Sequence, residues 1–148
     1  MTLMQRRRAL MGQNRAKPKN GFVVGGSGYL TAIGRNRLKL TNWKRWTWAD
    51  CSIVDPIDVD PEDVIDLRLI YVSGDNYIMR DTASRLGDIT MKTIKGAASS
   101  IANLSGTKTV TAATQLTRLG LLGNDEYYTP AQPLIFDVEV YVNGKRVI

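Results

Sequence analysis

Residues 134–148 read L-I-F-D-V-E-V-Y-V-N-G-K-R-V-I. Every second residue from Leu134 to Val142 is apolar, which places these side chains on one face of a strand. Asn143 and Gly144 follow, and this pair favours a type I′ turn because both residues tolerate positive φ. The stretch therefore predicts a strand, a tight turn and a return strand over 145–148.

Similar short runs separated by glycine and turn residues occur upstream, and they predict strands at 22–24, 29–33, 37–40, 65–71, 77–79 and 89–94. Residues 96–123 fit either a helix or threonine-rich strands, and the threonine content favours strands. Many short strands indicate a mainly β fold, either a jelly-roll-like β-sandwich or a small barrel. With 148 residues, we expect one β-rich domain at 21–148, preceded by an extended basic N-terminal arm at 1–20.

The charges are unevenly distributed along the chain. Eleven lysines and arginines, and no acid, precede Asp50, whereas seven carboxylates and no base lie between Asp50 and Asp66. Separated blocks of opposite charge allow a chain to contact a copy of itself. The acidic residues that we expect to form such a partner surface are Asp58, Asp60, Glu62 and Asp63.

The N-terminal arm combines apolar and basic side chains. Residues 2–11 have the spacing of a short helix with one apolar stripe beside three arginines. A helix of this length is marginal in water, so it requires a partner to become ordered. The residues that we expect to form this assembly arm are Leu3, Met4, Arg6, Arg7, Arg8, Leu10 and Met11. Residues 12–20 are polar and predict an extended linker.

Three tryptophans, Trp43, Trp46 and Trp48, lie where the chain changes from basic to acidic. The preferred interpretation is that Trp46 and Trp48 alternate on a strand and pack into the core. The second is that the tryptophans anchor a subunit interface. Stacking on nucleic-acid bases ranks third and stacking on sugars fourth.

The composition excludes several kinds of chemistry. The chain has no histidine and one cysteine, Cys51, so histidine-dependent catalytic triads, intrachain disulfides and cysteine zinc sites are excluded. The glycines at 25, 26 and 28 lack the lysine of a phosphate-binding loop, so a turn is favoured. The acids at 55–63 lack the glycine of a calcium loop and fit an edge strand. We expect no enzyme, no catalytic, cofactor-binding or metal residue, and no membrane span.

The opening Met4-Gln5-Arg6-Arg7-Arg8-Ala9-Leu10-Met11 resembles the start of small virion structural proteins of tailed bacteriophages, in which such a segment precedes a β-rich body. The resemblance implies a capsid-, neck- or tail-associated subunit in the virion, made in the host cytoplasm. Its partners are then copies of itself and other virion proteins. Two alternatives stay open: a nucleic-acid- or ribosome-associated protein that binds through the basic arm, and a carbohydrate-binding module.

Overall fold

The computed structural model describes residues 18–25, 29–41, 47–74, 83–92, 103–122 and 132–148, and their regular secondary structure is entirely β. The strands are β1 (Leu30–Ala32), β2 (Arg37–Leu40), β3 (Trp48–Val59), β4 (Val64–Ser73), β5 (Ala83–Leu86), β6 (Ile89–Lys92), β7 (Asn103–Thr109), β8 (Thr114–Leu122), β9 (Leu134–Val142) and β10 (Lys145–Arg146). The helix expected at 2–11 and the strand expected at 77–79 lie outside the described residues. In the described part, no helix is long and apolar enough to cross a bilayer.

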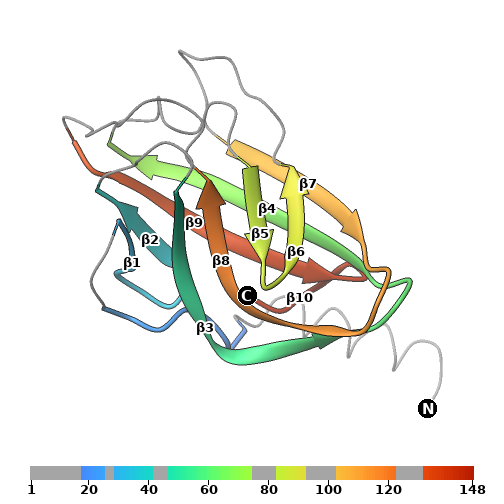
Figure 1. The fold of residues 1–148 in the computed structure, drawn as a ribbon. Coiled ribbons are helices and arrows are strands. Elements are labelled where there is room, and N and C mark those ends of the chain that lie inside the picture. The colour runs from blue at the N-terminus through green and yellow to red at the C-terminus, as the bar shows by residue number, and fades with distance from the viewer. Residues whose placement is uncertain (1–17, 26–28, 42–46, 75–82, 93–102, 123–131) are drawn as a thin grey trace.

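The strands form two antiparallel sheets, which face each other in Figure 1. The first has the order β1-β2-β9-β4-β7, with β10 also paired to β9, and the second has the order β3-β8-β5-β6. The mainly β prediction is confirmed. The small-barrel alternative is wrong. Among the described residues, only isolated bridges through residues 22–25 connect β1 with β3, and no continuous ladder closes the two sheets into a barrel.

The strand pairs are nested along the chain. β2 pairs with β9, β3 with β8, β4 with β7, and β5 with β6, all antiparallel. Successive pairs fall in opposite sheets. The chain from β2 to β9 therefore follows the path of one long hairpin that has been rolled up, and the rolling adds the contacts of β4 with β9 and of β5 with β8.

The inner faces of both sheets contribute to one hydrophobic core. The alternation predicted for residues 134–142 and 65–71 is confirmed by the burial of the inward residues of β9 and β4. The buried residues are Leu134, Phe136, Val138, Val140, Ile65, Leu67 and Leu69, while Val142 and Tyr71 at the strand ends are half-buried. The terminal turn is also confirmed: φ is 52° at Asn143 and 79° at Gly144. Both values are positive, as a type I′ turn requires.

Residues 103–122 fold as strands β7 and β8, so the strand alternative is correct over this part of the uncertain segment. The prediction of an edge strand is correct for residues 55–59, since β3 ends its sheet, whereas residues 60–63 form the turn to β4. β3 begins already at Trp48 and is longer than its acidic part suggested. Strand β5 was not predicted, because A-S-R-L carries no alternation long enough to recognise.

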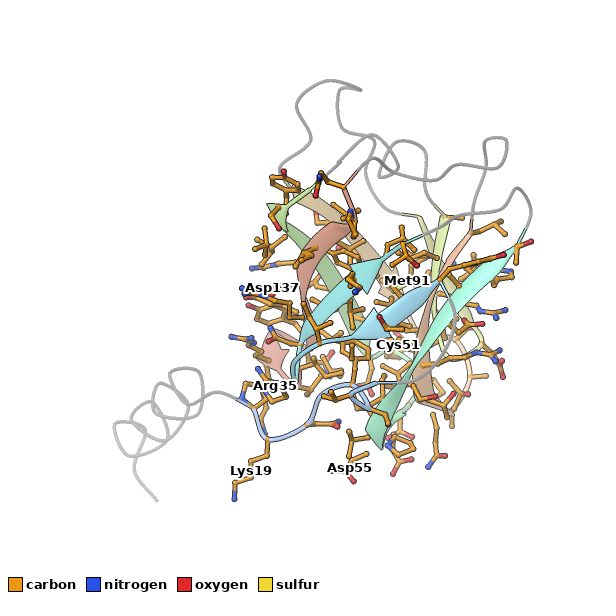
Figure 2. The ribbon with its side chains drawn as sticks, turned by 90° about the vertical axis from the view of Figure 1, so that its left-hand side faces the viewer. Lys19, Arg35, Cys51, Asp55, Met91 and Asp137 are labelled. Carbon is orange, nitrogen blue, oxygen red and sulfur yellow. The ribbon has the colours of Figure 1, made fainter. Side chains whose placement is uncertain are left out.

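A short segment, residues 20–24, lies between β1 and β3, and we call it the N-terminal strap. Phe22 forms a bridge with Ile53 and is only 1% exposed. The side chain of Asn20 accepts a hydrogen bond from Asp55 N (3.0 Å) and donates one to Asp55 O (2.8 Å), as a peptide group would. Arg35 Nη1 donates to Asn20 O (2.6 Å). Figure 2 shows Lys19 pointing away from the body just before the strap.

Candidate functional site

A cluster of charged and aromatic side chains lies on the outer face of the four-stranded sheet. Its members, which we call the Asp50 cluster, are Trp48, Asp50, Arg85, Arg118 and Gly120. Ala49 and Cys51 of β3 are buried, so the alternating side chains of Trp48 and Asp50 point outward. The interpretation of Trp48 as a core residue is therefore wrong. Trp43 and Trp46 lie outside the described residues.

Arg85 reaches across strand β8 to hold Asp50. Its Nη2 donates to both carboxylate oxygens of Asp50 (3.1 Å to Oδ1 and 3.0 Å to Oδ2), and its Nε donates to Oδ1 at 3.3 Å. The same guanidinium lies 4.2 Å from the ring centroid of Trp48. Planar stacking and paired hydrogen bonds are both characteristic of arginine, so Arg85 fixes the two β3 side chains together.

Gly120 makes this reach possible. It pairs with Asp50 on one side and with Arg85 on the other. A Cβ atom at position 120 would overlap Asp50 Oδ1 and come within 2.9 Å of Arg85 Cγ and Nε. Because Gly120 has no side chain, the Asp50–Arg85 ion pair can pass directly over strand β8 at this position. A glycine inside a strand commonly marks such a close approach, and this was the one signal of the cluster in the sequence.

Arg118 is the second guanidinium beside the same carboxylate. Its Nε lies 3.8 Å from Asp50 Oδ1, too far for a hydrogen bond, and it is a buried atom with no hydrogen-bond partner. The side chain as a whole is 39% exposed. The two guanidinium groups of Arg85 and Arg118 share the one carboxylate of Asp50, so the cluster carries one positive charge in excess.

The four predicted acidic residues lie at the end of β3 and in the turn that leads to β4. Asp58 accepts a hydrogen bond from Gln115 Nε2 (2.8 Å). Asp60 and Glu62 are exposed, and neither side chain has a hydrogen bond or ion pair. Both carboxylate oxygens of Asp63 accept hydrogen bonds from other residues of the chain: Oδ2 accepts from Asp60 N (2.8 Å), and Oδ1 accepts from Asn143 Nδ2 (2.9 Å).

These hydrogen bonds give a pH prediction. The donation from Asp60 N and then from the Asn143 amide lowers the pKa of Asp63. A lowered folded-state pKa contributes stability above the unfolded pKa, about 3.9, that is lost as pH falls through the folded value. The free energy of unfolding of the wild type should therefore decrease between about pH 5 and below pH 4 as Asp63 becomes protonated. Asp63→Asn removes this titrating group, so the free energy of unfolding of the variant should decrease less over the same range. Urea unfolding across this range tests it.

The control for this measurement is Glu62→Gln, because Glu62 is adjacent in the turn and has no side-chain hydrogen bond. Its pH profile should follow that of the wild type. A profile for Asp63→Asn that is also indistinguishable from the wild type would show that the turn gains nothing from the charged carboxylate.

Two further side-chain pairs lie elsewhere in the described part of the chain. On the outer face of the six-stranded sheet, Arg37 holds Asp137 (2.8 Å) and Arg68 lies over the ring of Tyr141. Burial raises the pKa of the Cys51 thiol. A shallow groove of about 430 Å³ runs between the start of β6 and the β7–β8 connection. The described residues contain no group of three or more acids and cysteines arranged to bind a metal.

Comparison of the chain with protein-family models, with curated proteins and with solved structures found no match.

The predicted arm residues lie outside the part of the chain that the structure describes, whereas the predicted acidic residues lie within it. Arg85, Arg118 and Gly120 were missed by the sequence analysis, because their partner Asp50 is far away along the chain.

Proposed function

We propose that this protein is a non-enzymatic structural subunit of a bacteriophage virion, capsid-, neck- or tail-associated, and that its two sheets form a jelly-roll β-sandwich. The subunit assembles with copies of itself and with other virion proteins through its basic N-terminal arm and complementary charged surfaces. It is made in the host cytoplasm and resides in the particle.

The observation that carries the proposal is the nested strand pairing. When β2 to β9 receive the letters B to I, the two sheets have the orders B-I-D-G and C-H-E-F, which is the jelly-roll order. Viral capsid subunits are one of the main groups of proteins that use this fold. Fold alone does not define function, so the arm and the charge pattern supply the second part of the argument.

The strap supports an arm that leaves the body at a defined point. Asn20 and Phe22 are held against β3 and Arg35, whereas Lys19 is exposed and points outward. Seventeen residues in extended form reach about 55–60 Å, compared with a radius of gyration near 15 Å for a domain of this length. An arm that begins there has the length to cross onto a neighbouring subunit.

A carbohydrate-binding module is the second candidate, because jelly rolls also include lectins. Sugar binding of this kind needs an open aromatic face. The Arg85 guanidinium covers one face of Trp48, and each described aromatic side chain is buried or half-buried. These observations favour the structural subunit.

The test compares the full chain with a chain that lacks residues 2–17, which leaves Asn20 and the strap intact. We expect the full chain to form large assemblies by light scattering at low salt. These should shrink toward 1 M salt, where the Debye length is about 3 Å. The shortened chain keeps only the charged surfaces of the body, so it should assemble much more weakly than the full chain. As a control, Arg6, Arg7 and Arg8 are replaced together by lysine, which keeps the charge and should retain salt-sensitive assembly.

The alternatives predict different results. A monomeric full chain that copurifies with nucleic acid favours the nucleic-acid- or ribosome-associated protein. A monomer that binds immobilised glycans favours the carbohydrate-binding module. Either result would contradict the structural-subunit proposal.

A further inference from the structure

The Asp50 cluster contains a guanidinium without an acceptor. Arg118 has its Nε 3.8 Å from a carboxylate whose two oxygens are already bonded by Arg85, and no hydrogen bond leaves the Arg118 side chain. Nε itself is buried, so a group from outside can reach only the exposed part of the Arg118 side chain, which is 39% exposed. The excess positive charge of the cluster favours binding of one further carboxylate group there.

The same chain carries a rigid acidic turn without a partner. The turn from Asp60 to Asp63 is closed by Asp63 N donating to Asp60 O (3.1 Å), and Glu62 N donates to Val110 O (2.9 Å). Glu62 has a φ of 76° at the tip of the turn and is exposed. A turn fixed in this way presents the carboxylates of Asp60 and Glu62 with little ordering cost on binding.

The turn cannot contact Arg118 of its own molecule. Gln115 of β8 pairs with Asp58 of β3, so the level of Asp60 lies about five residues, or roughly 16 Å, beyond Arg118 along the sheet. The hydrogen bonds of the turn to Val110 prevent it from folding back. Contact between the two surfaces therefore requires two molecules.

We propose that the acidic turn of one copy docks on the Asp50 cluster of the next copy, with Asp60 or Glu62 accepting hydrogen bonds from Arg118. This inference rests on the self-assembly in the proposed function and names the surfaces involved. The contact joins two different surfaces of the same chain, so it is heterologous and extends into a ring or a filament. The hydrogen bonds between Arg85 and Asp50 already fix these two side chains before a second copy binds.

The test is a charge exchange between the two surfaces. One variant carries Arg118→Glu and the other carries Asp60→Arg with Glu62→Arg. Each variant alone juxtaposes like charges at the contact, so its association should weaken at least about tenfold in sedimentation or light scattering. Mixing the two variants restores opposite charges at every contact, so assembly should return. Lys39→Glu, an equal charge change on the other sheet, is the control and should assemble as the wild type does.

Arg118→Glu also places a second carboxylate beside Asp50, so Arg118→Gln is measured in parallel, with thermal unfolding to confirm that it folds. It should also weaken assembly. Normal assembly of both single-surface variants, or a mixture that stays as weak as its components, overturns the inference while leaving the proposed self-assembly intact. A wild-type chain that remains monomeric overturns both.

Discussion

Replacing Phe22 by alanine is expected to lower the free energy of unfolding by about 3–5 kcal/mol, the usual range for removing a large buried aromatic side chain. Phe22 lies in the N-terminal strap, is only 1% exposed and forms a bridge with Ile53 of β3. The strap connects the edges β1 and β3 of the two sheets. Its aromatic side chain therefore belongs to the core, although it precedes the first strand. Urea or guanidinium unfolding of the full chain measures the loss.

The neighbouring residue provides the control. Val23 is 49% exposed and hydrogen-bonds through its backbone to Ser52 (2.9 Å), so truncation of its side chain leaves that bond in place. Val23→Ala should change the stability by no more than about 0.5 kcal/mol. Equal losses in the two variants would mean that the strap does not contribute its side chains to the core.

Replacing Gly74 by alanine should be costly for two separate reasons. The φ of Gly74 is +87°, a backbone conformation that costs an L-residue about 1–2 kcal/mol. In addition, an added Cβ would overlap the carbonyl oxygen of Pro133 and lie 2.8 Å from its carbon. Relieving such a clash requires backbone movement between the end of β4 and the start of β9, at a further cost of about 1–3 kcal/mol. We expect a total loss of about 2–5 kcal/mol in thermal or urea unfolding.

Gly25 separates the two causes. Its φ is +91°, but a Cβ there meets no atom within 4 Å. Gly25→Ala should therefore cost only the conformational part, about 1–2 kcal/mol. If the two alanine variants lose the same stability, the packing of Gly74 against Pro133 does not constrain the fold.

The sequence predicted the strands that carry a long alternating pattern. β9 and β4 were recognised because their inward residues are apolar at every second position, and the last turn because Asn143-Gly144 suits positive φ. Such signals are local, since they depend on residues within one strand or one turn. The short strand β5 gave no signal, because four residues are too few to show a period.

The candidate site was predicted only in part. The acidic turn could be named because consecutive carboxylates are visible in the sequence. Nothing in the sequence indicates that the carboxylate of Asp63 forms a hydrogen bond within the fold to Asn143, which is 80 residues away. Trp48 was assigned to the core from its aromatic character. In β3 its neighbour Ala49 points into the core instead, and successive residues of a strand point to opposite faces, so Trp48 lies on the outer face.

The sequence by itself determined that the protein is mainly β, that it ends in a tight hairpin, and that its charges are segregated. The tertiary structure alone decided the order of the strands and the union of Asp50, Arg85 and Arg118 across Gly120. The reason is physical. Strand formation follows from local alternation, whereas the choice of partner strand depends on how all the apolar faces are buried together, and residues 35 or more positions apart then become neighbours.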